Sequence, residues 1–382
     1  MLIFLNWATF LNRKMAKIRK IPNQKEMIGL LRSGKVALPP VSFRVLKNGT
    51  ETTNIGFDAL VEASWRGSKA RFVVECKSLS TPKAFRNGLN SLKTGTLPKG
   101  YWPLLFLPFL GEQQLQELEK EQISGIDLCA NGVVVVPGKF AVFRSGERNR
   151  FSSSAPIKNI YRRNSSMVAR VFFSFPTYKT VQEIYREINR RNVLVDSWKK
   201  RPMSLSTVSK SLKTLENDLI LDRKGIIRLL QPDKLLEKLS QNYAAPDIKA
   251  GIRLKVQPEE ETLRGLLRRL SQEIDVPIVA TGASSVGQYA VMQRGDLLSV
   301  YCPSLEMLVK RLPGSRTDRF PNLEIIETDD ETVYFDAQKD EEFWWASSVQ
   351  VYLELMSGDK RDKETAEQVR SLILKDVERV LQ

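Results

Sequence analysis

Apolar and polar residues form short alternating runs at the start of the chain. In QKEMIGLLRSGK (24–35) the apolar residues recur at helical spacing up to a glycine, which predicts a short amphipathic helix. IGFDALVEASWR (55–66) and ARFVVECKS (70–78) predict two strands joined by a tight turn at Gly67 and Ser68. The apolar run FVV leads directly into Glu75 and Lys77. Strand alternation places these two opposite charges on one face of a strand otherwise suited to burial.

The pattern then continues as helices and strands in turn. Thr81 and Pro82 begin a helix, because proline suits the first helical turn. YWPLLFLPFL (101–110) predicts a buried strand, GEQQLQELEKEQ (111–122) a helix and ISGIDLCANGVVVVPG (123–138) another buried strand. A helix, a hairpin and alternating helices and strands predict a mixed sheet covered by helices, so we expect an α/β domain over 22–160.

A second pattern begins near residue 165. Apolar spacing predicts helices in MVARVFFSF, TVQEIYREINRR and SLSTVSKSLKTLEND, then a two-stranded hairpin turning at Lys224 and Gly225, then a helix in DKLLEKLSQNY. This order is typical of a winged helix-turn-helix, which we assign to 165–243. In the third helix we expect one inward face, formed by Leu205, Val208, Leu212 and Leu215.

The last block, 250–382, is predicted to be a further α/β domain. It begins with a helix in EETLRGLLRRLSQE, and strands follow in VPIVATG, LLSVYCP and LEIIET. GASSVG lacks the GK[ST] end of a phosphate-binding loop, so we interpret it as a turn from a strand into a helix. The acidic stretch 327–342 has no ligand spacing, and we interpret it as a solvated hairpin.

Composition adds a partner class. The chain has 382 residues, 42% of them hydrophobic, which is enough for two or three cores, and we expect three modules. It has 59 Lys and Arg against 44 Asp and Glu, a formal net charge of +15. Such a surface attracts polyanions, so nucleic acid is the expected partner.

Two absences exclude whole classes of chemistry. The chain has no histidine, which excludes Ser-His-Asp triads and His-based zinc sites. Any catalysis must therefore use carboxylates, lysines and a hard metal. Cys76, Cys129 and Cys302 are scattered without a CxxC motif, so we expect neither disulfides nor structural zinc, and a cytoplasmic location.

The N-terminal stretch 1–21 is predicted to be an extension. Its apolar run MLIFLNWATFL precedes the basic residues instead of following them, which is not the order of a signal peptide. The run is also shorter than the roughly 20 residues that a membrane span needs. Met15 is an alternative start of the chain.

Asp58 and the Glu75–Lys77 pair together form the pattern D-x16-ExK on adjacent predicted strands behind a helix. This pattern resembles the PD-(D/E)xK nuclease superfamily, which has the restriction endonuclease-like fold. The resemblance implies that Asp58, Glu75 and the main-chain carbonyl of Cys76 hold Mg²⁺. It also implies that Lys77 orients or activates the attacking water and stabilises charge on the phosphate. Glu26 on the preceding helix would be the additional acid that many members carry.

The alternative is a strand whose Glu and Lys point to solvent, without a site. The chemistry of the nuclease interpretation is coherent, because Mg²⁺ prefers hard oxygen ligands and keeps several waters.

The predicted winged helix has a polar outer surface. We expect DNA contacts from residues on the third helix and on the wing: Ser206, Thr207, Lys210, Lys213, Thr214, Arg223, Lys224 and Arg228. This module resembles the winged helices of bacterial regulators, with a protein-contact module as the alternative. The stretch 139–163 is also basic, with interleaved Phe140, Phe143, Phe151 and Tyr161, so it is either a further nucleic-acid contact or a solvated linker.

The order IVATGASSVGQYA, LLSVYCPS and ASSVQVYLELMSGDKRDKETAEQVRSLIL resembles the C-terminal part of the AbiEi family, antitoxins of type IV toxin-antitoxin systems. ISGIDLCANGVVVVPGKFAVFRSGERNRF also resembles a segment of those proteins. The family's antitoxins are DNA-binding repressors of their own operon, which implies a partner toxin or another operon-encoded protein. In that family the winged helix is at the N-terminus, whereas here it is predicted behind the nuclease-like domain.

Two functions remain open on the sequence. The first is a DNA-binding protein that cleaves phosphodiester bonds with Mg²⁺. The second is a non-catalytic transcriptional regulator or antitoxin, in which the first domain keeps its fold for binding only. A structural protein with no nucleic-acid partner is disfavoured by the net charge of +15.

Overall fold

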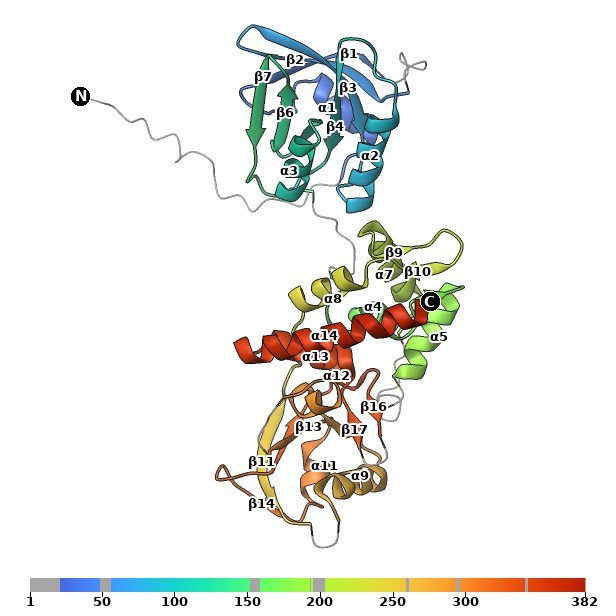
Figure 1. Cartoon of the computed structure of the whole chain (residues 1–382), viewed down its shortest axis with the longest axis vertical. Coiled ribbons are helices and arrows are strands. Elements are labelled where there is room, and N and C mark those ends of the chain that lie inside the picture. The colour runs from blue at the N-terminus through green and yellow to red at the C-terminus, as the bar shows by residue number, and fades with distance from the viewer. Residues whose placement is uncertain are drawn as a thin grey trace, which may run out of the picture. The chain divides into compact units, whose positions relative to one another are not determined.

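The structure is a computed structural model that describes residues 21–48, 56–151, 159–192, 194, 203–258, 261–292, 296–340 and 343–381. The chain is a mixed α/β protein, as predicted, with several mixed sheets. It divides into two compact units, Met1–Pro156 and Ile157–Gln382 (Figure 1). Met15 and all but the last residue of the predicted N-terminal extension lie outside the described residues.

A seven-stranded mixed sheet forms the centre of the first unit, in the order β1-β2-β3-β4-β5-β6-β7. The strands β3, β4 and β5 are parallel to one another, and the other neighbours are antiparallel. The bounds are β1 (Ser42–Asn48), β2 (Ala59–Trp65), β3 (Ser68–Cys76), β4 (Tyr101–Leu107), β5 (Ser124–Asp127), β6 (Gly132–Val136) and β7 (Phe140–Arg144). The predicted mixed sheet is thus confirmed, and β1 is a strand that we did not predict.

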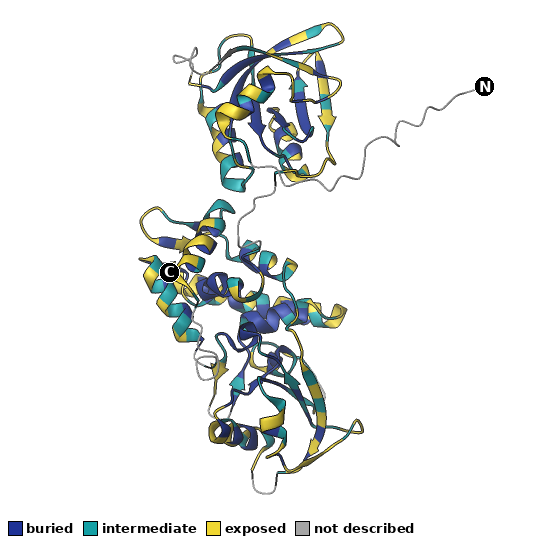
Figure 2. Cartoon of the chain, turned by 180° about the vertical axis from the view of Figure 1, so that it is seen from behind, coloured by how far each residue is buried: buried dark blue, intermediate teal, exposed yellow. Residues whose placement is uncertain are grey.

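Helices cover both faces of this sheet, whose central strands are buried (Figure 2). One face packs against α1 (Gln24–Arg32), whose buried Met27 and Leu31 join the cluster around Phe72 and Val74. The other face packs against α2 (Pro82–Thr94) and α3 (Glu112–Lys120), with Val73 of β3 in that second cluster. The predicted start of α2 is confirmed, because Thr81 caps it and proline occupies its first turn.

Two turns in this unit decide where strands begin and end. Arg66 and Gly67, with φ of 48° and 82°, join β2 to β3, one residue earlier than the predicted turn at Gly67 and Ser68. Two consecutive positive φ angles suit the twist of a two-residue hairpin. The segment 123–138, predicted as one strand, is two antiparallel strands, β5 and β6. The Asp127 carboxylate accepts N–H groups of Cys129 and Asn131, which reverses the chain there.

The second unit begins with helices and a small sheet. The helices are α4 (Met167–Ser174), α5 (Val181–Arg191), α7 (Leu205–Asn217) and α8 (Pro232–Gln241). The strands β8 (Thr177–Tyr178), β10 (Ile227–Leu229) and β9 (Leu221–Asp222) form a three-stranded sheet in that order. The predicted succession of three helices, a hairpin and a closing helix is confirmed. Leu205, predicted to face inward, is instead 44% exposed, because it lies in the first turn of α7 next to the cap residue Ser204.

A second seven-stranded sheet follows, in the order β14-β11-β15-β13-β12-β17-β16. Its strands are β11 (Ala250–Val256), β12 (Val279–Ala280), β13 (Leu298–Cys302), β14 (Gly314–Arg316), β15 (Leu323–Glu327), β16 (Gln338–Lys339) and β17 (Trp344–Trp345). Its helices are α9 (Leu263–Ile274), α10 (Gly282–Ser285), α11 (Leu305–Val309), α12 (Glu331–Tyr334), α13 (Ser348–Met356) and α14 (Lys360–Leu381). The block therefore opens on the strand β11, where a helix was predicted first.

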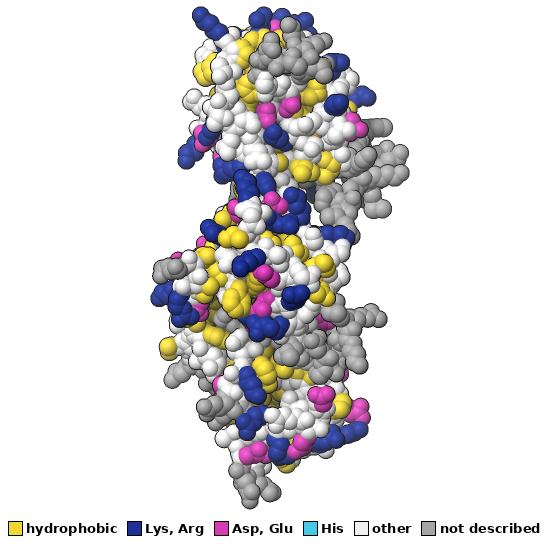
Figure 3. Space-filling view, turned by 90° about the vertical axis from the view of Figure 1, so that its right-hand side faces the viewer, with side chains coloured by type: hydrophobic (Ala, Val, Ile, Leu, Met, Phe, Trp, Pro, Cys, Tyr) yellow, Lys and Arg dark blue, Asp and Glu magenta, His cyan; other side chains and the backbone are white. Residues whose placement is uncertain are grey.

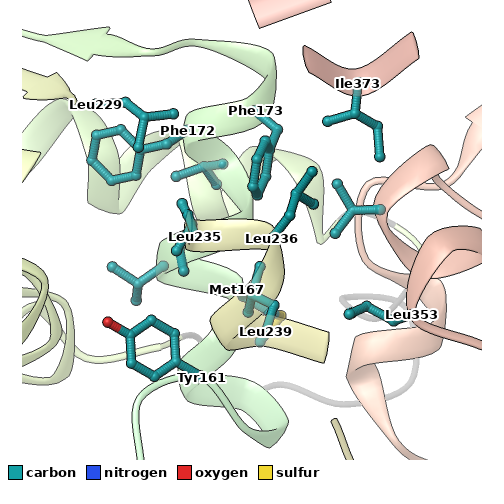
Figure 4. Packing of buried hydrophobic residues seen from close by; sticks show 14 of the residues in the cluster. Tyr161, Met167, Phe172, Phe173, Leu229, Leu235, Leu236, Leu239, Leu353 and Ile373 are labelled. Atoms are coloured by element: carbon teal, nitrogen blue, oxygen red, sulfur yellow. The ribbon is translucent and has the colours of Figure 1, made fainter. Parts of the chain in front are cut away.

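One hydrophobic cluster joins the two predicted modules of this unit. Phe173 of α4 and Leu236 of α8 face Leu353 of α13 and Ile373 of α14 in the same core (Figure 4). Arg170 of α4 is also buried there and donates hydrogen bonds to Gln350 Oε1 at 2.8 Å and to the Thr332 carbonyl at 3.1 Å. The segments 165–243 and 250–382 thus fold against each other as one compact unit.

The acidic segment 327–342 is not a solvated hairpin, and that prediction is wrong. Val333, Tyr334 and Phe335 are fully buried, since α12 turns these apolar residues into the core. Burial also raises the pKa of Asp336, which Arg191 contacts. Every helix in the described part of the chain is too short or too polar to cross a membrane.

Candidate functional site

Asp58 and Glu75 project from the same face of the first sheet. Asp58 immediately precedes β2, and its N–H donates to the Val74 carbonyl at 3.0 Å. Antiparallel pairing of Leu60 with Val73 and of Ala59 with Val74 makes Asp58 the next residue opposite Glu75. Cross-strand neighbours of this kind place their Cβ atoms about 4.5–5.5 Å apart. The two predicted carboxylates therefore lie together.

Lys77 shares this face and contacts Glu75 directly. Its ammonium forms an ion pair with Glu75 Oε1, as expected for residues two positions apart on one face of an extended chain. The Glu75 side chain is 8% exposed and the Lys77 side chain 26% exposed. A Cβ atom placed on Gly88 of α2 would lie 3.4 Å from Cγ of Lys77, so the lysine stem passes close to the backbone of that helix. The pair is thus nearly buried, with its ammonium end partly open to solvent.

The peptide groups around Cys76 are held from two sides. Asp58 Oδ2 accepts the Cys76 N–H at 2.7 Å, and Gln24 Nε2 donates to the Cys76 carbonyl at 2.5 Å. The Cys76 thiol points to the opposite face, where it lies 3.9 Å from Met27 Sδ. Burial raises the pKa of that thiol, with Asp58 and Glu75 adding to the effect, which disfavours the reactive thiolate.

Gln24, and not Glu26, is the residue of α1 that reaches this site. Glu26 is exposed, and its carboxylate accepts the Asn23 N–H at 2.7 Å in a capping box. None of the contacts among the described residues joins it to Asp58 or Glu75. Gln24 was missed because a polar residue in the first turn of a helix is ordinary, and its partner is 52 residues away in the sequence.

These residues present hard oxygen donors that fit a small divalent cation. The donors are the carboxylates of Asp58 and Glu75 and the carbonyl of Cys76, all at the end of β3. Two carboxylates and one carbonyl leave positions for water, which suits Mg²⁺. The described residues contain no group of three or more Asp, Glu or Cys side chains poised around one ion. The fit therefore depends on these two carboxylates together with the main-chain oxygen.

The same sheet edge carries a fixed loop that the sequence analysis did not identify. The Phe109 N–H donates to Ser80 Oγ at 2.8 Å, and the Leu110 N–H donates to Asp127 Oδ2 at 3.0 Å. Since β3, β4 and β5 are parallel, their carboxyl ends meet at this edge. Burial raises the pKa of Asp127, although its hydrogen bonds oppose that shift. Asp127 thus holds the loop that follows β4, through Leu110, near the end of β3 that carries the candidate site.

The helix α7 carries the predicted DNA contacts of the second unit. Ser206, Lys210 and Lys213 are exposed, and Thr207 and Thr214 are half-buried. Dark blue Lys and Arg side chains gather at the end of the second unit that carries α7 and the hairpin β9–β10 (Figure 3). The structure therefore places all five predicted α7 residues on an accessible surface.

The hairpin β9–β10 adds cations that differ in whether they form an ion pair. Lys224 and Arg228 are exposed, and among the described residues neither has an ion-pair partner. Arg223 shares the Glu216 carboxylate with Lys213, at 3.9 and 3.1 Å. Two of the predicted cations thus share an ion-pair partner, while Lys210, Lys224 and Arg228 have none in the described part of the chain.

Only part of the basic stretch 139–163 lies on the protein surface. Phe140 and Tyr161 are buried, and the Tyr161 hydroxyl donates to Asp218 Oδ2 at 2.5 Å. Phe143 in β7 is 45% exposed, and residues 152–158 lie outside the described part of the chain. Two of the four interleaved rings therefore serve packing and not stacking on bases.

Comparison with family models, with curated proteins and with solved structures found no match to this chain.

Proposed function

We propose that this chain is a DNA-binding protein whose first unit cleaves phosphodiester bonds with Mg²⁺, at a site like that of the PD-(D/E)xK nucleases. The observation that carries the proposal is that the side chains of Asp58, Glu75 and Lys77 lie on one face of the sheet, next to the Cys76 peptide group. A solvent-facing strand would leave Glu75 exposed, whereas it is buried and paired with Lys77. A restriction endonuclease-like fold for this unit belongs to the same proposal.

Each residue has a distinct role in this proposal. Asp58, Glu75 and the Cys76 carbonyl would hold the cation, which when bound lowers the pKa of a coordinated water and neutralises phosphate charge. The Lys77 ammonium donates a hydrogen bond to the attacking water or to a phosphate oxygen and so orients the reacting groups. Gln24 keeps the Cys76 carbonyl in a fixed orientation.

The second unit would supply DNA affinity. We infer a winged helix-turn-helix from α5, α7 and the hairpin β9–β10, with α7 in the major groove. Lys210, Lys224 and Arg228 would contact phosphates, while Ser206 and Thr207 lie where a helix can reach bases or phosphates. The net charge of +15 supports attraction to DNA, and the three scattered cysteines support a cytoplasmic location.

The test is nicking of supercoiled DNA by the purified full chain with Mg²⁺ or Mn²⁺. Glu75→Ala and Lys77→Ala should each abolish nicking while changing DNA affinity less than twofold, because the basic surface carries binding. Glu62→Gln is the matched control, since Glu62 lies in β2 but pairs with Arg44 away from the site. Wild-type protein that leaves single-stranded, duplex and branched DNA intact with either metal would refute the cleavage proposal.

A second candidate is a non-catalytic regulator or antitoxin with the AbiEi-like C-terminal part. It is favoured by the ion pair itself, because Lys77 balances the Glu75 charge without any metal. This candidate predicts sequence-specific duplex binding with no divalent-ion requirement, and a partner encoded in the same operon. The nicking test separates the two candidates.

A further inference from the structure

The loop between β14 and β15, residues 317–322, presents an aromatic ring to solvent. Phe320 is 87% exposed, far more than a side chain placed for packing. Its φ of +53° lies in the left-handed region, which bulky residues rarely adopt. Both features oppose stability, and strained positions of this kind cluster at functional sites.

The loop is anchored at both of its ends. The Thr317 N–H donates to the Arg253 carbonyl at 3.0 Å, and Thr317 Oγ1 accepts the Arg319 N–H at 3.0 Å. Asn322 forms two hydrogen bonds with the main chain of Val256, at 2.8 and 2.7 Å. These contacts fix the loop on β11, so the tip that carries Phe320 is held in place.

Two cations without ion-pair partners lie near this ring along the chain. Arg316 is the last residue of the exposed edge strand β14, and Arg319 directly precedes Phe320 in the loop. Among the described residues neither has an ion-pair partner, whereas Arg253 pairs with Glu324 at 2.9 Å. Asp318 is the one acid within the loop. Cations on an edge strand can serve to prevent pairing with other chains, but that role does not explain an exposed aromatic ring.

We propose that this tip binds single-stranded nucleic acid, with a base stacked on Phe320 and phosphates at Arg316 and Arg319. A planar ring beside cations complements a base beside phosphates, and such stacking tolerates any base. An unpaired strand is favoured over a duplex, because a duplex must first unstack a base step before the ring can enter. Within the second unit this edge lies at the end opposite α7 (Figure 1), so it is a surface separate from the proposed duplex-binding helix.

The test is binding of labelled oligothymidylate and oligouridylate of about 12 nucleotides, a length within the range of known single-strand sites. The probes are titrated with the full chain by fluorescence anisotropy at several salt concentrations. Phe320→Ala should weaken binding at least fivefold without changing the salt dependence, and Phe320→Trp should retain affinity within twofold. Arg316→Ala with Arg319→Ala should flatten the salt dependence by about 0.7 per residue in logarithmic slope.

The control is Lys360→Ala with Lys363→Ala, which removes two exposed lysines of α14. Thermal unfolding of each variant verifies folding, which an exposed side chain should not affect. The proposal is overturned if Phe320→Ala loses no more affinity than this control, or if it weakens a duplex as much as the single strands. A preference between the two probes assigns the strand as DNA or RNA. Lys210→Ala with Lys213→Ala should bind both probes normally, so failure here is distinguishable from failure of the duplex-binding proposal.

Discussion

The Asp58 carboxylate accepts a hydrogen bond from the main-chain N–H of Cys76, with 2.7 Å between Oδ2 and the nitrogen. This bond links the residue before β2 to the last residue of β3 and sets the carboxylate beside Glu75. One interaction thus has two consequences: it fixes the hairpin at its open end, and it orients a candidate metal ligand. The two consequences can be separated by mutation.

Asp58→Asn should lower Mn²⁺ affinity at least tenfold while leaving the melting temperature nearly unchanged. The asparagine carbonyl can still accept the Cys76 N–H, but the negative charge is lost. Asp58→Ala removes the hydrogen bond as well and should cost about 1–3 kcal/mol of unfolding free energy. Isothermal titration calorimetry and thermal unfolding of both variants test this. Equal stability losses for Asn and Ala would mean that the hydrogen bond has no structural role.

Gln24 should act as a positioning residue for the Cys76 carbonyl. Gln24→Ala should weaken Mn²⁺ binding several-fold, because the carbonyl loses its amide donor, and Gln24→Glu should strengthen it by adding an anionic oxygen. Glu26→Gln is the control, since that residue caps α1 and should leave metal affinity unchanged. The same calorimetric titration measures all three. A loss in Glu26→Gln as large as in Gln24→Ala would show that only helix stability matters.

The α7 surface should contribute to duplex binding beyond its charge. Lys210→Ala with Lys213→Ala should weaken duplex binding at least tenfold, equivalent to about 1.4 kcal/mol. Each lost phosphate contact should lower the logarithmic salt slope by about one, whereas a lost base contact should blur one position of the preferred sequence. A salt titration against the Lys360→Ala with Lys363→Ala control decides the matter. Matching losses in the two double variants would leave α7 with no special role.

The stability of the second unit should depend on Glu354, which lies in the buried network with Arg170 and Gln350. Burial raises the pKa of Glu354 above its ordinary value of 4.5, although hydrogen bonds from Gln350, the Gly282 N–H and Tyr301 oppose that rise. A raised folded pKa means that the folded state binds the proton more tightly than the unfolded state does. The contribution of Glu354 to stability is therefore greatest below pH 4.5 and is lost as pH rises toward its folded pKa.

Glu354→Gln should remove this pH-dependent contribution to stability, because glutamine does not titrate. As pH rises above 4.5, the unfolding free energy of the wild type should therefore fall relative to that of the variant. Urea unfolding at a series of pH values measures that difference. A difference that does not depend on pH would contradict the assigned shift.

Much of the candidate site could be predicted because strand alternation is a local rule. The spacing of Glu75 and Lys77 fixes their common face as soon as the strand is recognised. The register could not be fixed in this way, because a turn at Gly67 and Ser68 would place Asp58 opposite Lys77, whereas the observed turn at Arg66 and Gly67 places it opposite Glu75. Gln24 could not be predicted in this way. Its contact with Cys76 depends on how α1 packs across the sheet, which is decided by tertiary structure and not by local pattern.

Two further differences between prediction and structure involve apolar patterns that lie among charged residues. In 327–342 the surrounding acidic residues favoured a solvated hairpin. The segment also contains the apolar run Val333, Tyr334 and Phe335, which is buried. In β11 the alternation of Ile252, Leu254 and Val256 with Arg253 and Lys255 is a strand pattern, but it is shorter and weaker than the helical pattern that follows it. Both cases show that a few apolar residues at the correct period outweigh neighbouring charges.

The central claim is that Asp58, Glu75 and the Cys76 carbonyl form a divalent metal site, and crystals of the full chain soaked in Mn²⁺ test it most directly. The anomalous difference map should contain a peak within bonding distance of both carboxylates and of the carbonyl oxygen, and the peak should be absent from Glu75→Ala crystals soaked in parallel. A wild-type map without a peak there, or with Lys77 still on Glu75 at saturating Mn²⁺, would contradict the claim.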